Sequence, residues 1–196
     1  MSQTLSKIAG KELAGLLPIV ALPGPAAASV QECRLAAEAI DRLEAGGFPI
    51  EATRVLAHAL PKREAVWWAC MCAAHTAPPD LPEADLLARA AAEQWVRQPT
   101  DKNRRATMHQ AEATSFETAD ALCAYAVFWC GETIGAEDQP PTPPTPGMAG
   151  KIIAAAILVA ALRGDPNRQD ARLQRFLESG RQIAAGGPGR IPPEAA

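Results

Sequence analysis

Ten consecutive residues near the middle of the chain, Ala65 to Ala74, are all apolar, and this run constrains the fold more than any other feature. Pro61 and the charged residues 62–64 come directly before it. A helix that is apolar on every side has to be surrounded by protein, and about ten residues are too few to cross a bilayer, which needs about 20. We therefore expect a buried central helix from Pro61 to His75, with residues 62–64 at its solvent-exposed end.

The rest of the chain carries signals for further helices and none for strands. It lacks β-branched runs, alternation with a period of two and Asn-Gly turns. A weak helix is expected over 5–17 and a second buried helix over 152–162. The remaining helix starts are predicted from caps and early prolines at Ser29, Pro49, Asp80, Thr100, Thr118 and Asp165. The sequence predicts an all-α fold, an irregular antiparallel array of about seven to nine helices around the central one.

Two segments differ in composition from these helices. Residues 132–147, here named the strap, contain Gln139-Pro-Pro-Thr-Pro-Pro-Thr-Pro146 and have to be extended, because proline fixes φ and removes backbone donors. We interpret the strap as a stiff spacer inside a single helical domain over 1–185, although its proline spacing also fits a polyproline ligand. The glycine- and proline-rich end, 186–196, is expected to be a flexible tail.

Charge and cysteine content exclude several classes of protein. The chain has 196 residues, 19 basic and 22 acidic, and a formal net charge of −3, which argues against a nucleic-acid partner. No apolar run is long enough for a membrane span. The five cysteines are odd in number and match no disulfide framework, which favours a reducing, cytoplasmic location.

No motif points to catalysis, a cofactor or a metal. Cys70 and Cys72, near His75, suggest a zinc or redox site, but side chains two positions apart on a helix point about 200° apart. We prefer burial of both thiols as small hydrophobes. The histidines His58, His75 and His109 match no hydrolase signature, and no glycine-rich phosphate loop is present.

The exposed end of the central helix supplies the candidates for function. Trp67 and Trp68 point about 100° apart, so one indole is able to reach a surface groove while the other fills the core. The residues selected as candidates for binding a partner are Arg63, Glu64, Trp68 and Arg104. The simpler interpretation is that these charges form ion pairs or cap helix ends.

Several segments together resemble a known family. Ala59-Leu60-Pro61-Lys62-Arg63-Glu64-Ala65-Val66-Trp67-Trp68-Ala69 is followed by Ala92-Glu93-x-Trp95-Val96, Pro99-Thr100-x-x-x-Arg104-Arg105 and Phe128-Trp129-x-Gly131. Over about residues 30–185 the chain resembles an uncharacterised bacterial family of alanine-rich helical proteins, a domain of unknown function. The resemblance implies an association with type VI secretion genes and transfers no activity. The chain departs from the pattern at Cys130, where a small hydroxyl residue is expected.

Two hypotheses for function remain open. In the first, the protein is a non-enzymatic protein-interaction module, an adaptor or chaperone-like accessory of a bacterial machine such as a secretion system, and its partner is another protein. In the second, it is a small enzyme or ligand-binding domain, with Arg63, Glu64 and His58 at the mouth of a tryptophan-lined pocket where the central helix starts.

Overall fold

The computed structural model describes residues 4–136 and 138–194. The regular secondary structure of these residues is helical. Over these residues, strand pairing is limited to one isolated antiparallel bridge between Glu12 and Leu35. The α-helices are α1 Leu17–Val20, α2 Gly24–Ser29, α3 Ala36–Ala45, α4 Pro49–Ala59, α5 Lys62–His75, α6 Glu83–Arg97, α7 Asp101–Glu112, α8 Ala119–Phe128, α9 Met148–Leu162 and α10 Gln169–Ala184, with 3-10 turns η1 Ser6–Ile8 and η2 Pro166–Arg168. Eight of these ten α-helices have seven or more residues, so the predicted all-α fold is confirmed.

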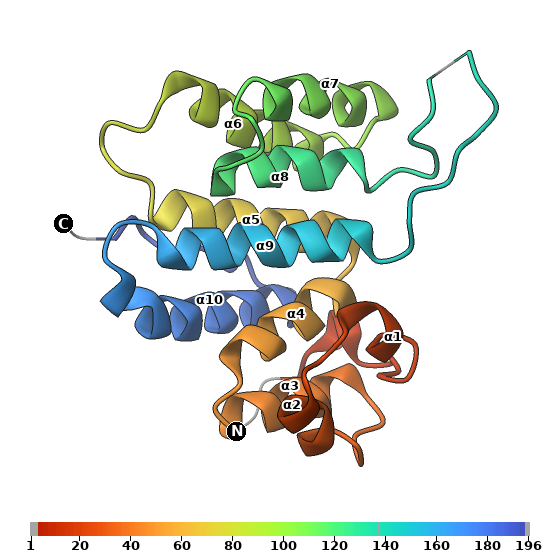
Figure 1. Cartoon of the computed structure of the whole chain (residues 1–196), viewed down its shortest axis with the longest axis vertical. Coiled ribbons are helices and arrows are strands. Elements are labelled where there is room, and N and C mark those ends of the chain that lie inside the picture. Colours follow the sequence, from red (N-terminus) through yellow and green to blue (C-terminus); the bar gives the residue numbers. More distant parts are fainter. Residues whose placement is uncertain (1–3, 137, 195–196) are drawn as a thin grey trace.

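The helices surround a central pair, α5 and α9, which lie side by side (Figure 1). Helices α6, α7 and α8 lie on one side of this pair, and α10, α4 and the N-terminal segment lie on the other (Figure 1). Helix α5 packs against α6, α8, α9 and α10, as the run of apolar residues predicts. Helix α9 contacts α4, α5, α8 and α10, so the second predicted buried helix is also present.

Several helices begin where local chemistry predicts. Pro49 is the first residue of α4, a position where its missing N–H costs nothing. The side chains of Thr100 and Thr118 accept hydrogen bonds from Asn103 N and Ala121 N at the starts of α7 and α8. Helix α3 ends before Gly47, whose φ of +77° suits the left-handed conformation that glycine adopts cheaply.

The helix boundaries predicted for the N-terminal part of the chain are wrong. Instead of one helix over 5–17, the chain forms the short η1 turn and a loop up to residue 16, and Leu17 is the first residue of α1. Ser29 ends helix α2 instead of starting a helix, and its hydroxyl donates to Ala26 O. The next helix, α3, starts later because Glu38 accepts hydrogen bonds from the backbone N–H groups of Arg34 and Leu35, at 2.8 and 3.1 Å. The sequence pattern of a capping box occurs only at Ser29, whereas at α3 the N-cap residue is Leu35 and the carboxylate of Glu38, at the third helical position, accepts the backbone hydrogen bonds.

A buried carboxylate links α8 to α6 and to the end of α9. Asp120, in the first turn of α8, is fully buried and lies between two guanidinium groups. Arg89 of α6 and Arg163, which follows α9, each form an ion pair with it, the latter at 2.5 Å. Arg163 also donates to Ala73 O of α5. This network joins α5, α6, α8 and the end of α9, and nothing in the helical periodicity of the sequence predicted it.

The end of the chain is ordered over 186–194, contrary to the expectation of a flexible tail. Ser179 Oγ donates to Gly189 O, and Glu194 N donates to His75 O at 2.7 Å. The Glu194 carboxylate pairs with Arg172, at 2.6 Å, and with Arg168. Gly189, with φ +57°, packs so closely that a Cβ there would lie 2.3 Å from Ile183 Cγ1. Hydrogen bonds from α5 and α10 therefore hold this segment on the helices; residues 195 and 196 lie outside the described residues.

Candidate functional site

The apolar face of α5 is not enclosed on every side. Seven of the ten residues from 65 to 74 are buried, whereas Trp67, Met71 and Ala74 are only partly buried. These three share one face of the helix, since they are three or four positions apart. One stripe of the central helix therefore reaches the surface, and it begins beside the charged residues 63 and 64.

Trp68 is a core residue, and its interpretation as a surface residue is wrong. Its side chain is 0% exposed, and its indole N–H donates to Phe176 O of α10 at 2.7 Å. The neighbouring Trp67 takes the surface position: its indole N–H donates to Pro188 O at 2.8 Å. As expected, one indole fills the core and the other reaches the surface. The core residue is Trp68 and the surface residue is Trp67, the reverse of the selection made from the sequence.

A cleft of about 350 Å³ opens at Trp67, where α5 starts. We name it the Trp67 cleft; its lining residues are Lys7, Arg63, Glu64, Trp67, Val96, Arg97, Ile183 and Gly187. Arg63 and Glu64, selected from the sequence, both lie in it. The other lining residues come from the N-terminal turn, the end of α6 and the end of α10, and sequence reasoning missed them because no periodicity links such distant segments.

The charged side chains of the Trp67 cleft form few hydrogen bonds and ion pairs with the rest of the protein. Arg63 is exposed, and its Nε donates to Val96 O at 2.6 Å. No acceptor for its two terminal nitrogens is found within the described residues. Glu64 forms a 2.5 Å ion pair with Lys7, and Arg97 lies 3.5 Å from Glu93. Exposed pairs of this kind contribute about 0–1 kcal/mol, so an incoming carboxylate is able to compete for these cations.

Arg104 is not a surface residue either. Its side chain is 3% exposed. It donates to Asp101 Oδ1 at 2.8 Å, to Phe128 O at 2.6 Å and to Thr133 O at 3.0 Å. The guanidinium thereby fastens α7 to the end of α8 and to the first residues of the strap, which is the simpler, structural role. Hydrogen bonds from Arg105 and Arg104 hold the pKa of Asp101 below its ordinary value.

His58 lies in a different pocket from Arg63 and Glu64. This pocket, of about 290 Å³, is on the other side of the α5 start, and we name it the His58 pocket. Its lining residues are Lys11, Gly15, Leu16, Ile19, Ala57, His58, Leu60, Lys62, Trp129, Pro144, Thr145, Pro146, Gly147, Met148, Ala149, Gly150 and Ile153. The single tryptophan-lined pocket expected from the sequence is therefore divided in two, with Trp67 in one part and Trp129 in the other.

The His58 ring is held in one orientation. Its Nδ1 lies 2.8 Å from Arg54 O and has to donate to it. Burial lowers the pKa of His58, against the opposing effect of the Arg54 and Gly147 backbone. The ring packs on Gly150 of α9, where a Cβ would lie 2.6 Å from His58 Cδ2.

All five cysteines are unpaired thiols; Cys70, Cys72, Cys123 and Cys130 are buried, and Cys33 is partly buried. The thiol of Cys123 raises the pKa of Cys70 through a hydrogen bond, with burial as the second cause. Burial, with Cys123 as the second cause, raises the pKa of Cys72, and burial raises that of Cys130 to about 12. Over the described residues, no group of three or more histidine, cysteine, aspartate or glutamate side chains is placed to hold a metal ion.

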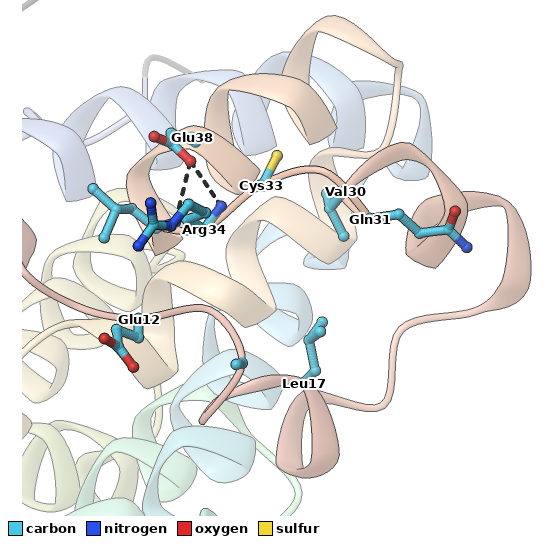
Figure 2. Close-up of a pocket in the computed structure, with 9 residues that line it drawn as sticks. Glu12, Leu17, Val30, Gln31, Cys33, Arg34 and Glu38 are labelled. Carbon is cyan, nitrogen blue, oxygen red and sulfur yellow. Dashed lines mark hydrogen bonds between the residues drawn. The ribbon is translucent and has the colours of Figure 1, made fainter.

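A further cavity, of about 570 Å³, lies between the N-terminal loop and the start of α3 (Figure 2). Glu12 and Leu17 lie on one side of it, and Val30, Gln31 and Cys33 lie on the other (Figure 2). Its charged lining residues are Glu12, Arg34 and Glu38, and Glu38 is already used as the cap of α3.

Within the described part of the chain, no helix is long and apolar enough to span a membrane. Comparison with curated proteins and with solved structures finds no similar protein. A family model does match, over residues 39–184, and this range includes helices α4 to α10 in full. The chain thus belongs to the family of unknown function DUF6931.

Proposed function

We propose that the protein is a non-enzymatic protein-interaction module, and that the Trp67 cleft binds an acidic segment of a partner protein. The observation that carries the proposal is the position of a partly exposed indole beside a guanidinium whose terminal nitrogens have no acceptor within the described residues. An indole supplies a large rigid contact surface, and tryptophan and arginine are the residues that contribute most at protein interfaces.

The charge of the cleft selects the kind of partner. Three cations, Lys7, Arg63 and Arg97, line it together with a single carboxylate, Glu64. The terminal nitrogens of Arg63 form a planar fork that matches a carboxylate. Val96 and Ile183 supply the apolar wall next to the indole. A segment with aspartate or glutamate beside an apolar or aromatic residue is complementary to this arrangement.

The proposal also covers the cellular role and the location of the protein. The sequence resemblance supports a role as an adaptor or chaperone-like accessory of a bacterial machine, such as a type VI secretion system. The five unpaired cysteines support a cytoplasmic location, because thiols persist in reducing compartments. The alternative function, a ligand-binding domain, is supported by a separate observation, the His58 pocket on the other side of the α5 start.

The experiment is a selection from a displayed library of random 12-residue peptides on the purified protein. We expect enrichment of peptides that carry an acid next to an apolar or aromatic residue. A double variant, Arg63→Ala with Arg97→Ala, should bind an enriched peptide at least about tenfold more weakly, because it loses charge-assisted hydrogen bonds to the acid.

The matched control is Arg175→Ala, which removes an exposed arginine of α10 outside the cleft. This variant should bind the enriched peptide as the unchanged protein does. Enrichment without acidic residues, or equal loss of affinity in both variants, would contradict the proposal.

A further inference from the structure

Residues 186–194, here named the C-terminal segment, lie on a surface that α5 and α10 form together. The chain turns back after α10, so the segment runs along this helix in the opposite direction (Figure 1). On α5, Trp67 Nε1 donates to Pro188 O at 2.8 Å. Eight residues further along this helix, His75 Nδ1 donates to Pro192 O. Eight helical residues rise about 12 Å, and four residues of a polyproline helix rise about the same distance. The segment is therefore extended and parallel to α5.

The side chains under the C-terminal segment present hydrogen-bond donors to it. Besides the indole and the imidazole of α5, Ser179 Oγ donates to Gly189 O, and Arg172 Nη2 donates to Glu194 Oε2 at 2.6 Å. His75, Arg172 and Ser179 are all buried. Buried donors need acceptors, so a chain that lies here has to supply carbonyl or carboxylate oxygens. We name this area the α5–α10 surface; it consists of Trp67, His75, Arg172, Ser179 and Ile183.

The composition of the C-terminal segment suits the α5–α10 surface. Three of its nine residues are prolines, which have a carbonyl acceptor but no backbone N–H. Proline-rich segments dock beside aromatic side chains in an extended conformation that they already favour, which lowers the entropy cost of binding. Two positions are selective. Gly189 excludes larger residues, because a Cβ there would lie 2.3 Å from Ile183 Cγ1, and Glu194 supplies the anion for Arg172.

The C-terminal segment is attached with little apolar burial. Six of its nine residues are exposed, and its one large apolar side chain, Ile191, is only partly buried. Hydrogen bonds and the ion pair of Glu194 supply the other contacts described above. Segments held in this way open at a lower free energy than the whole fold. Another chain with the same pattern of acceptors is therefore able to replace it.

We propose that the α5–α10 surface binds an extended, proline-containing segment of a partner protein, and that the C-terminal segment occupies this surface as an intramolecular competitor. The partner segment supplies a glycine where Gly189 lies and a carboxylate five residues later, which pairs with Arg172. The seated C-terminal segment identifies this occupant, because it shows which acceptors the surface takes. Trp67 borders both sites, but Arg172 lies at the opposite end of α5 from Arg63. The inference therefore does not depend on the function proposed for the Trp67 cleft.

The test uses the full chain and a fluorescein-labelled peptide with the sequence of residues 186–194, followed by fluorescence anisotropy. In the variant Gly189→Ala, the added Cβ meets Ile183 and the φ of +57° is strained, so the variant's own segment leaves the surface. We expect this variant to bind the peptide at least about tenfold more tightly than the unchanged protein, because a tethered competitor acts at a local concentration of about 1 mM.

Altered peptides and a second protein variant make the test specific. A peptide with alanine in place of Gly189, or with glutamine in place of Glu194, should bind at least about tenfold more weakly. The protein variant Glu194→Gln weakens its own segment without added volume. It should also bind the original peptide more tightly than the unchanged protein does, which keeps the test decisive if Gly189→Ala does not fold.

Further variants, made in the Gly189→Ala protein, locate the peptide. Ser179→Ala removes one donor and should weaken binding about fivefold. Its matched control is Gln174→Ala, at an exposed residue of α10 that lines a different cavity, and this change should have no effect. The double change Arg63→Ala with Arg97→Ala should also have no effect, which separates this surface from the Trp67 cleft.

Two measurements decide whether a partner is able to use the surface. A library of random 12-residue peptides, selected on Gly189→Ala after removal of those that bind the unchanged protein, should enrich an acid five positions after a glycine, with proline between them. In the unchanged protein, the amide of residue 194 should exchange with solvent faster than the buried amides of α5.

Each of several results would overturn the proposal. These are failure of the peptide to bind the folded Gly189→Ala and Glu194→Gln variants, equal binding of the alanine peptide, enrichment of a different pattern, or equal exchange at residue 194 and in α5. A doubled mass of the unchanged protein in light scattering would assign the surface to the segment of a second copy and would also contradict binding of a partner protein.

Discussion

Replacing Trp68 with alanine should destabilise the protein far more than the same change at its neighbour Trp67. Trp68 is fully buried, and its indole N–H donates to Phe176 O at 2.7 Å. Gly180 of α10 lies directly against the ring, because a Cβ at that glycine would be 2.7 Å from Trp68 Cε2. Close packing on helical backbone leaves little room for neighbouring groups to fill the cavity.

The expected loss follows from that geometry. Truncation of a buried tryptophan costs about 3–5 kcal/mol through lost burial and an unfilled cavity. Trp67 is partly exposed, and truncation there should cost about 1–2 kcal/mol through its smaller buried area and one exposed hydrogen bond. Trp68→Phe, which keeps part of the ring, should lose about 1–2 kcal/mol.

Guanidinium denaturation followed by far-ultraviolet circular dichroism measures the difference. With a slope of about 4 kcal/mol per molar denaturant, Trp68→Ala should lower the midpoint by about 1 M, and Trp67→Ala by less than half of that. Equal losses in the two alanine variants, or a loss below about 1 kcal/mol at Trp68, would refute the assignment of Trp68 to the core.

Three further outcomes follow from the polar contacts. Asp120→Asn leaves Arg89 and Arg163 without their shared anion and should cost about 3 kcal/mol in chemical denaturation, and a change below about 1 kcal/mol would contradict the buried network. Arg104→Lys loses the fork that reaches two carbonyls, so stability should fall by about 2 kcal/mol and amides of the strap should exchange faster; unchanged exchange there would count against an anchoring role. Arg172 lowers the pKa of Glu194 through a hydrogen bond, so this pair stabilises the folded end of the chain above the unfolded carboxyl pKa of about 4.3 and loses that effect as the pH falls through the lower folded pKa. Amide protection at residue 194 should therefore decrease on acidification, and a Glu194→Gln variant that keeps the same pH dependence would disprove the cause.

The sequence was sufficient for the parts of the fold that depend on local chemistry. The apolar run from 65 to 74 predicted the central helix, because a helix without a polar face is stable in water only when other parts of the protein cover it. Pro49, Thr100 and Thr118 predicted helix starts because a cap or an early proline acts within a single turn.

The errors concern contacts between distant segments. The N-terminal capping pattern at Ser29 did not start a helix; Ser29 ends α2, and Glu38 accepts the backbone hydrogen bonds at the start of α3 although no Ser or Thr stands three residues before it. The order of residues 186–194 depends on acceptors and donors of α5 and α10, which no local rule for glycine and proline includes. Periodicity placed the two indoles about 100° apart but did not decide which one faces α10.

The candidate site was predictable only in part, for the same reason. Arg63 and Glu64 were found because they lie at the boundary between the charged and apolar parts of α5. Lys7, Arg97 and Ile183 reach the same cleft from other elements, and only the tertiary structure brings them together. A signal in the sequence did exist for the His58 pocket, since Gly147 and Gly150 flank the start of an apolar helix after a run of prolines.

The most direct test of the proposed function is the affinity of an enriched acidic peptide for the Trp67→Ala variant, measured by isothermal titration calorimetry with Trp67→Phe beside it. Loss of the indole should weaken binding at least about tenfold, with part of the affinity retained by phenylalanine, while circular dichroism shows both variants folded. An affinity equal to that of the unchanged protein in the folded Trp67→Ala variant would contradict the claim that this cleft is the binding surface.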